Sequence, residues 1–250
     1  KLDPTLMREE LLAKWGALGV LGRIYVAEEG INAQLCVPSA RFDEFEAQVH
    51  SYPEFADIPF KIAVEEKDTP SFYKLAIKIK DKIVADGLSD ESFDVTDTGE
   101  YVTAKEFNEY IDDEDAVVVD MRNAYESEVG HFKGAILPAV ESFREELAVV
   151  PELLKDKKDK KIALYCTGGI RCEKASAYLK HQGFKNVYQL HGGIIDYKHQ
   201  IEREGLTSKF KGKNFVFDER LGERITDDVL AKCHQCDRMC DDYTNCANVE

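Results

Sequence analysis

One stretch of the sequence decides the fold: KIALYCTGGIR, residues 161–171. Its first part, residues 161–165, is a nearly continuous apolar run, which predicts a strand buried on both faces of a sheet. Cys166 and two glycines follow directly, and a helical pattern then occupies residues 171–182 and ends at a glycine. A buried strand that leads through a glycine-rich turn into a helix is typical of a parallel α/β sheet.

The same kind of strand recurs on both sides of this stretch. Residues 116–120 (AVVVD) and 186–190 (NVYQL) are further candidates for strands, and helical patterns separate the three segments. Upstream, Thr103 and Glu106 form a capping box that opens a short helix. We therefore expect residues 101–207 to form an α/β domain in which helices wrap a parallel sheet.

The first third of the chain has a different pattern. Its predicted elements, in order, are a helix that starts at Asp3-Pro4, a hairpin of strands at 23–27 and 31–37, a helix capped by Ser39, and strands at 60–64 and 75–79. This order gives an α+β fold of ferredoxin-like or acylphosphatase-like type over residues 1–84, provided that one further strand precedes residue 1.

Two segments of unusual composition flank the α/β domain. Residues 85–100 are rich in Asp, Ser, Thr and Gly, which predicts a linker, and residues 208–250 form a Cys-rich C-terminal segment. Four thiols there could reach one ion, so tetrahedral zinc is the leading expectation, with disulfides, free thiols or an iron–sulfur cluster as the open alternatives. The four residues are Cys233, Cys236, Cys240 and Cys246.

Charge and hydropathy limit the partners of the chain. The 33 Lys and Arg residues against 48 Asp and Glu residues give a net charge of −15, which repels nucleic acid at long range. No apolar run approaches the roughly 20 residues that span a bilayer, and the start lacks a signal-peptide layout. We expect a soluble, cytoplasmic protein without membrane or DNA partners.

Any RNA contact must use local groups of basic residues, of which the sequence has two. The upstream group is Lys74, Lys78, Lys80 and Lys82, and the downstream group is Lys198, Arg203, Lys209, Lys211 and Lys213.

Cys166 is the candidate catalytic residue, because it follows a buried strand and precedes a helix, where parallel α/β sheets place their ligands. The loop that follows it can turn backbone N–H groups inward, and the helix dipole and the Arg171 cation add positive charge. We therefore predict a pKa for Cys166 below the free value of about 8.5, and a nucleophilic thiolate. A small buried hydrophobe is the alternative reading of a lone cysteine, and the strand, loop and helix together argue against it. The predicted anion-binding residues are Thr167, Gly168, Gly169, Ile170 and Arg171.

Cys172 lies on the first turn of the predicted helix. It could resolve an oxidised or persulfidated Cys166, or it could simply pack in the core, and the sequence leaves both readings open.

The region of residues 101–205 resembles the rhodanese family. The resemblance rests on the Cys166 loop together with VVDMR at 118–122, Glu126, GHFKGAI at 130–136 and LHGG at 190–193. It implies that the loop cysteine carries a persulfide, and a six-residue loop such as this one suits sulfur transfer, whereas a seven-residue loop suits phosphate chemistry. A sulfurtransferase is therefore one functional hypothesis.

Almost the whole chain resembles the bacterial tRNA uridine hydroxylases. The matching motifs are EEGIN at 28–32, CTGGIRCEK at 166–174, NFVFDER at 214–220 and the Cys-rich tail. This resemblance implies conversion of the wobble uridine of tRNA to 5-hydroxyuridine, with molecular oxygen as co-substrate, the anticodon region as partner, and Cys166 as the essential cysteine.

The residues alone do not point to an oxygenase. None of the six histidines forms an evident two-His-one-carboxylate iron signature, no flavin or nicotinamide fingerprint is present, and the electron donor is not indicated. A cysteine-centred route is compatible, since thiolate addition at C6 of a pyrimidine would make C5 electron-rich. A third hypothesis, not enzymatic, is a redox-sensing or sulfur-sensing adaptor.

Overall fold

The computed structural model describes residues 2–65, 69–88 and 93–244, in two compact units. The first unit comprises Lys1–Phe60, Glu66–Ala85 and Phe217–Arg220, and the second comprises Lys61–Glu65, Asp86–Val216 and Leu221–Glu250. None of the described helices is long and apolar enough to cross a membrane.

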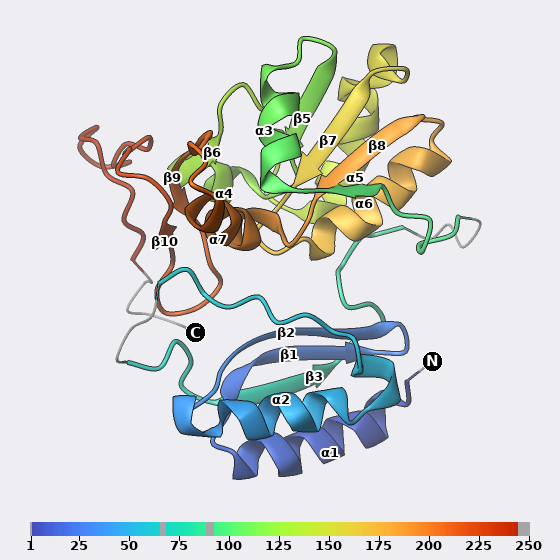
Figure 1. Ribbon diagram of the computed structural model, residues 1–250, viewed down its shortest axis with the longest axis vertical. Coiled ribbons are helices and arrows are strands. Elements are labelled where there is room, and N and C mark those ends of the chain that lie inside the picture. Colours follow the sequence, from blue (N-terminus) through green and yellow to red (C-terminus); the bar gives the residue numbers. More distant parts are fainter. Residues whose placement is uncertain (1, 66–68, 89–92, 245–250) are drawn as a thin grey trace. The chain divides into compact units, whose positions relative to one another are not determined.

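The first unit is a three-stranded sheet with two helices against it (Figure 1). Helix α1 (Pro4–Ala17) begins as predicted, because the Asp3 carboxylate accepts hydrogen bonds from the first turn. The strands β1 (Leu21–Ala27) and β2 (Gly30–Cys36) form the predicted antiparallel hairpin, and β3 (Leu75–Ile79) pairs in parallel with β1. Helix α2 (Phe42–His50) supplies Phe45, which packs edge-on against Trp15 in the core of this unit.

Two local predictions for this unit are wrong. Ser39 does not cap α2, because a short 3₁₀ helix, Ser39–Arg41, comes first and Arg41 stands at the N-cap position. Residues 60–64 form no strand, although their apolar residues alternate as a strand requires. The reason is that residues 61–65 belong to the second unit, where the backbone of Ile62 and Val64 hydrogen-bonds with the side chains of His199 and Glu223 instead of a neighbouring strand.

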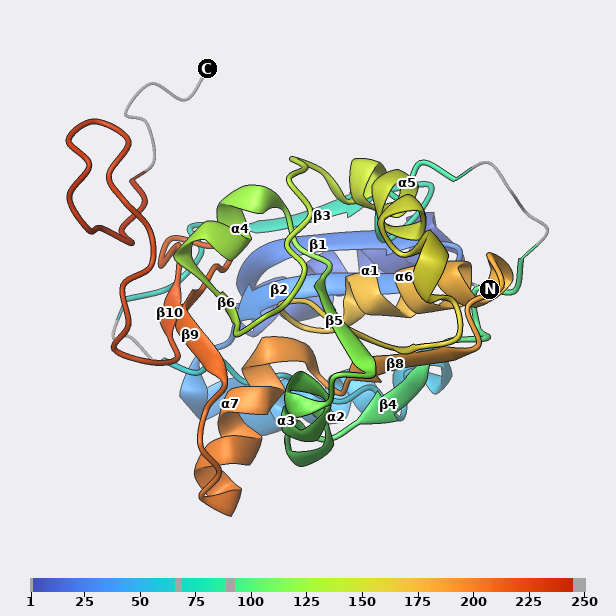
Figure 2. The same ribbon diagram turned by 90° about the horizontal axis from the view of Figure 1, so that it is seen from above.

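The second unit is built on the predicted parallel sheet, with strands in the order β4-β8-β7-β5. The bounds are β4 (Glu100–Val102), β5 (Ala116–Asp120), β7 (Lys161–Tyr165) and β8 (Asn186–Leu190). Helices α5 and α6 lie on one side of this sheet and α3 and α7 on the other (Figure 2). These helices are α3 (Ala104–Asp112), α5 (Phe143–Leu153), α6 (Ile170–His181) and α7 (Gly193–Glu204).

A second, antiparallel sheet completes this unit. Its strands lie in the order β10-β9-β6, with β6 (Gly130–Phe132), β9 (Phe210–Asn214) and β10 (Glu223–Arg224), and helix α4 (Ala124–Val129) precedes β6. Phe132 is fully buried, and four aromatic rings meet it edge to face. They belong to Phe107, Tyr165, Tyr197 and Phe210.

The described part of the predicted linker, residues 85–100, lies along α6. The ammonium of Lys174 on α6 donates to the Asp86 carboxylate at 3.0 Å, and both side chains are buried. Farther along, Ser176 accepts a hydrogen bond from the backbone N–H of Gly99, and Phe93 packs edge-on against Tyr178. Composition predicts a linker here, and specific contacts hold its described part against α6, the helix that follows Cys166.

Candidate active site

A buried polar network fixes the end of the strand that carries Cys166. The Tyr165 hydroxyl donates to Asp120 Oδ2 at 2.7 Å, and the Arg122 guanidinium donates to both oxygens of the same carboxylate. Arg122 also donates to the carbonyl oxygen of Gly130 at 2.6 Å. Since Asp120 ends β5 and Tyr165 ends β7, the network joins the carboxyl ends of two neighbouring strands where the reactive loop begins.

Cys166 is held as a thiolate by the loop that follows it. Burial of the sulfur opposes ionisation, but the Cys172 thiol, the Arg171 charge and the backbone N–H groups of Cys172 and Arg171 lower the pKa of Cys166 to about 5. The backbone N–H of Gly169 also donates to Cys166 Sγ, at 3.1 Å. Gly169 has φ +97°, a left-handed conformation that favours glycine and turns its N–H toward the sulfur. The physical basis predicted for the reactive group is therefore present in the fold.

This thiolate gives a direct spectroscopic prediction. A pH titration of the ultraviolet thiolate absorbance, taken as the difference between the unaltered protein and Cys166→Ser, is expected to show a midpoint near pH 5. An ordinary cysteine would give about 8.5. A midpoint near that ordinary value would mean that the loop amides and Arg171 do not stabilise the anion.

Arg171 acts on Cys166 through its charge, while its donor groups are engaged elsewhere. Its guanidinium forms a bidentate ion pair with the Glu126 carboxylate, through two hydrogen bonds of 2.5 Å and 2.8 Å, and Glu126 is fully buried. The Arg171 guanidinium also donates to the Thr167 hydroxyl at 3.3 Å. An anion that approached the loop would have to compete with Glu126 for Arg171, which weakens the predicted anion-binding role of this side chain.

A second glycine loop supports the Cys166 loop from behind. The backbone N–H of Ile194 donates to the carbonyl oxygen of Cys166 at 3.0 Å, and that of Ile195 donates to the carbonyl of Thr167 at 3.2 Å. This approach requires glycine at position 193, because a Cβ there would lie 2.5 Å from the Cys166 oxygen and 2.6 Å from the Thr167 oxygen. The Gly192–Gly193 pair thus positions the backbone on which the thiolate depends.

Cys172 is fully buried and its thiol hydrogen-bonds with Cys166. Burial, followed by the neighbouring Cys166 sulfur, raises the pKa of the Cys172 thiol well above its ordinary value. Cys172 is therefore a proton donor to the Cys166 thiolate in this state. Its role as a resolving thiol stays a prediction.

Glu146, on α5, is a member of this site that the sequence reasoning missed. Its side chain is fully buried, and neither carboxyl oxygen has a hydrogen-bond partner within the described residues. Burial raises the pKa of Glu146 to about 10; Arg171 opposes that rise, and the charges of Asp120, Glu126 and Cys166 add to it. Glu146 is therefore a neutral acid at neutral pH, close to the charged groups of the site. A glutamate in the first turn of a helix is common, so the sequence carries no signal for this burial.

The raised pKa of Glu146 makes the stability of the fold depend on pH. Because the pKa is about 10 in the folded chain and near 4.5 otherwise, the free energy of unfolding falls as pH rises through that window. The loss amounts to at most about 1.4 kcal/mol per pH unit. In urea unfolding, the free energy of unfolding of the unaltered protein is expected to fall by up to about 2.7 kcal/mol between pH 6 and pH 8. Glu146→Gln is expected to remove this fall.

The matched control is Glu145→Gln, at the exposed neighbouring position on the same helix. If both variants lost stability with pH as steeply as the unaltered protein, the pH dependence could not be assigned to Glu146.

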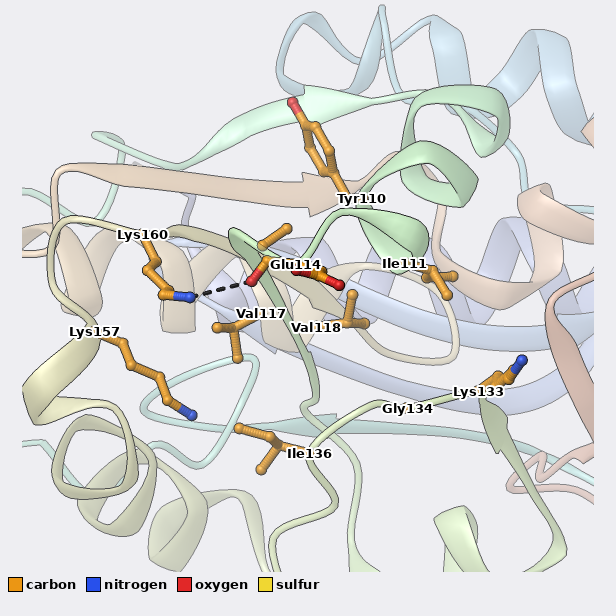
Figure 3. A pocket seen from close by; sticks show the side chains of 11 residues that line it. Tyr110, Ile111, Glu114, Val117, Val118, Lys133, Gly134, Ile136, Lys157 and Lys160 are labelled. Carbon is orange, nitrogen blue, oxygen red and sulfur yellow. Dashed lines mark hydrogen bonds between the residues drawn. The ribbon is translucent and has the colours of Figure 1, made fainter.

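A cavity of about 280 Å³ (Figure 3) lies beside the start of strand β5. Ala116, Val117 and Val118 at the start of β5 line it, and β5 runs parallel to β7, which ends beside Cys166. Ligands of parallel α/β sheets bind at the carboxyl ends of strands. This cavity is therefore separate from the candidate active site.

The Cys-rich tail stays a candidate metal site only as a prediction. Cys246 lies outside the described residues, and no group of three His, Cys, Asp or Glu side chains in the described part of the chain is placed to hold a metal ion. Backbone N–H groups of Gln235 and Cys236 lower the pKa of Cys233, an environment that suits a metal-binding thiolate.

The two predicted basic groups differ in their surroundings. All five residues of the downstream group contact carboxylates, namely Glu202, Glu204, Asp112, Asp228, and Asp241 with Asp242. In the upstream group, Lys74 and Lys78 form no ion pair with any residue that the structure describes. Lys74 and Lys78 are therefore more available for phosphate contacts than the residues of the downstream group.

Family models match three regions of the chain. An acylphosphatase-like domain, described as UPF0176, matches residues 2–83, a rhodanese-like domain matches residues 103–200, and a rhodanase C-terminal region matches residues 211–250. The predicted combination of an acylphosphatase-like domain, a rhodanese-like domain and a separate C-terminal region is confirmed.

Curated relatives match nearly the full chain. A protein of Leptospira interrogans named tRNA uridine(34) hydroxylase is 59% identical over 97% of this chain and 66% of its own length. A protein of Photorhabdus laumondii with the same name is 51% identical over 99% of this chain and 70% of its own length. The chain thus spans about two thirds of these relatives. Among solved structures, a rhodanese-like domain from Anabaena is similar over 60% of this chain and 93% of that domain, at 18% identity and a TM-score of 0.35.

Proposed function

Because this chain belongs to the family of tRNA uridine(34) hydroxylases, we propose that it hydroxylates the wobble uridine of tRNA to 5-hydroxyuridine with Cys166 as the reacting group. The observation that carries the role of Cys166 is its thiolate, held at a pKa of about 5 where β7 meets α6. A tRNA substrate implies that the protein works in the cytoplasm and contacts the anticodon region.

The proposed reaction begins with a bond from Cys166 Sγ to C6 of the uracil ring. The electron pair of the C5–C6 double bond moves onto C5, which then receives one atom of molecular oxygen. The other oxygen atom leaves as water, with two protons and two electrons from an external two-electron reductant. Loss of the C5 proton then expels the Cys166 thiolate and restores the double bond.

The decisive experiment is a mass analysis of nucleosides from undermodified tRNA, after incubation with the protein, a reductant and isotopically labelled oxygen. The proposal expects one labelled oxygen atom in uridine 34. An unchanged nucleoside would contradict it.

A second function has its own support. A low-pKa thiolate that accepts backbone N–H groups in a six-residue loop is also suited to carry a persulfide, as a sulfurtransferase requires. In that reaction the thiolate takes the outer sulfur of thiosulfate, sulfite leaves, and a thiolate acceptor later removes the sulfur. Consumption of thiosulfate with release of sulfite, measured with and without a thiol acceptor, tests this second function separately from the nucleoside analysis.

Zinc in the C-terminal segment is also proposed, on Cys233, Cys236, Cys240 and Cys246. Metal analysis of the purified protein tests this proposal, which is independent of the reaction at Cys166.

A further inference from the structure

A short segment from the first third of the chain is anchored in the unit that carries Cys166. This segment, residues 61–65, is here called the strap. The backbone N–H of Val64 donates to Glu223 Oε1 at 2.9 Å, and the His199 ring lies 2.9 Å from the Ile62 carbonyl oxygen. Glu65 in turn accepts a hydrogen bond from the backbone N–H of Arg224 at 2.8 Å. Val64 also packs against the core of this unit, so the strap has a defined place within it.

The strap places Lys61 on the Cys166 loop. A Cβ at Gly168 would lie 3.8 Å from Cδ of Lys61, and a Cβ at Gly169 would lie 3.8 Å from its ammonium nitrogen. The Lys61 side chain therefore runs along the two glycines that follow the reactive cysteine. It is exposed, and it forms no ion pair with the residues that the structure describes.

Lys61 has no carboxylate partner within the described residues, whereas the Arg171 guanidinium is bound to Glu126. A lysine ammonium on a flexible, exposed stem can turn to a new anion without breaking a contact within the protein. The chain as a whole carries a charge of −15, so a polyanionic substrate needs local cations where it is to be held.

We propose that Lys61 is a substrate-positioning residue, which binds a backbone phosphate of the nucleotide that enters the Cys166 loop. This inference rests on the proposed function for the identity of the substrate, a single-stranded part of an RNA. A uridine that reacts at Cys166 brings its own phosphates close to the loop, and Lys61 lies at that loop ready to contact one. The strap thereby makes a residue of the N-terminal sequence part of the active site.

The test compares Lys61→Ala, Lys61→Glu and Lys61→Arg in tRNA binding and in hydroxylation, at several salt concentrations. We expect Lys61→Ala to weaken binding about 10-fold and Lys61→Glu to weaken it further, with Lys61→Arg near the unaltered protein. The slope of log affinity against log salt should fall by about 0.7 to 0.9 for the alanine variant, since one phosphate contact is lost. KM should rise while kcat stays within about threefold.

The matched control is Lys157→Ala, which removes the same charge at the cavity on the opposite end of the sheet and should bind tRNA normally. Unchanged binding and an unchanged salt slope in the Lys61 variants would overturn the inference. So would a fall in kcat alone, because that would place Lys61 at the reacting base, and so would a shift of the Cys166 titration midpoint in Lys61→Ala.

These results can be told apart from failure of the proposed function. If tRNA gained no oxygen with the unaltered protein, while the Lys61 variants still weakened binding, the reaction would be wrong and the phosphate contact would stand.

Discussion

Cys166→Ser is expected to lower tRNA hydroxylation by roughly 10³-fold or more, while the fold and tRNA binding are kept. Serine replaces sulfur with a slightly smaller oxygen, so the buried site between β7 and α6 can hold it with little change in packing. A serine hydroxyl is not ionised near neutral pH, and it therefore cannot add to C6 of uracil in the way proposed for the thiolate. The measurement is single-turnover formation of 5-hydroxyuridine, with thermal unfolding as the check on the fold.

Cys36→Ser provides the matched control, because Cys36 ends β2 in the first unit and plays no part in the proposed reaction. Its activity should equal that of the unaltered protein. Full hydroxylation by Cys166→Ser would show that the sulfur is not the reacting group.

Gly193→Ala is expected to cause the largest loss among substitutions outside Cys166. The new Cβ would stand 2.5 Å from the carbonyl oxygen of Cys166, and the backbone at this position is left-handed, with φ +66°. The strained backbone costs about 1 to 3 kcal/mol, and the clash adds a similar amount of overpacking strain. Any relaxation moves the loop whose N–H groups stabilise the thiolate, so activity should fall at least about 100-fold. Unfolding in urea and the Cys166 titration measure the two effects separately.

Gly205→Ala is the control for backbone strain alone. Gly205 also has φ +66°, but a Cβ there meets no atom within 4 Å. This variant should lose only the same backbone cost, about 1 to 3 kcal/mol of stability, and keep its activity and its Cys166 midpoint. If the two glycine variants behaved alike, the contact between the Gly193 loop and the Cys166 loop would have no special role.

The centre of the site could be predicted from the sequence because its signals are local. A buried strand, a cysteine, two glycines and a helix lie within residues 161–182, and the capping box at Thr103 opens α3 as predicted. The hairpin of β1 and β2 is equally local, since the turn at Glu28 and Glu29 joins two strands that pair with each other. Such features depend on neighbours in the sequence.

The missed features depend on contacts between distant residues. Alternation at Phe60, Ile62 and Val64 suits a strand, but the same spacing allows Val64 to pack in another unit while Lys61 stays exposed. Glu146 is buried by helix packing around α5, and its own segment gives no sign of this. The contact between Lys61 and the Cys166 loop joins residues more than a hundred positions apart, so no local pattern could reveal it.

The buried ion pair between Asp86 and Lys174 limits how this protein could be divided into parts. A fragment that began at residue 100 would contain the whole parallel sheet and the Cys166 loop, yet Lys174, on the helix that follows Cys166, would lose its Asp86 partner. Removing one partner of a buried pair commonly costs about 3 to 5 kcal/mol, a large share of the stability of a small domain. We therefore expect a fragment that keeps Asp86 to be more stable than one that begins at the first strand of the sheet.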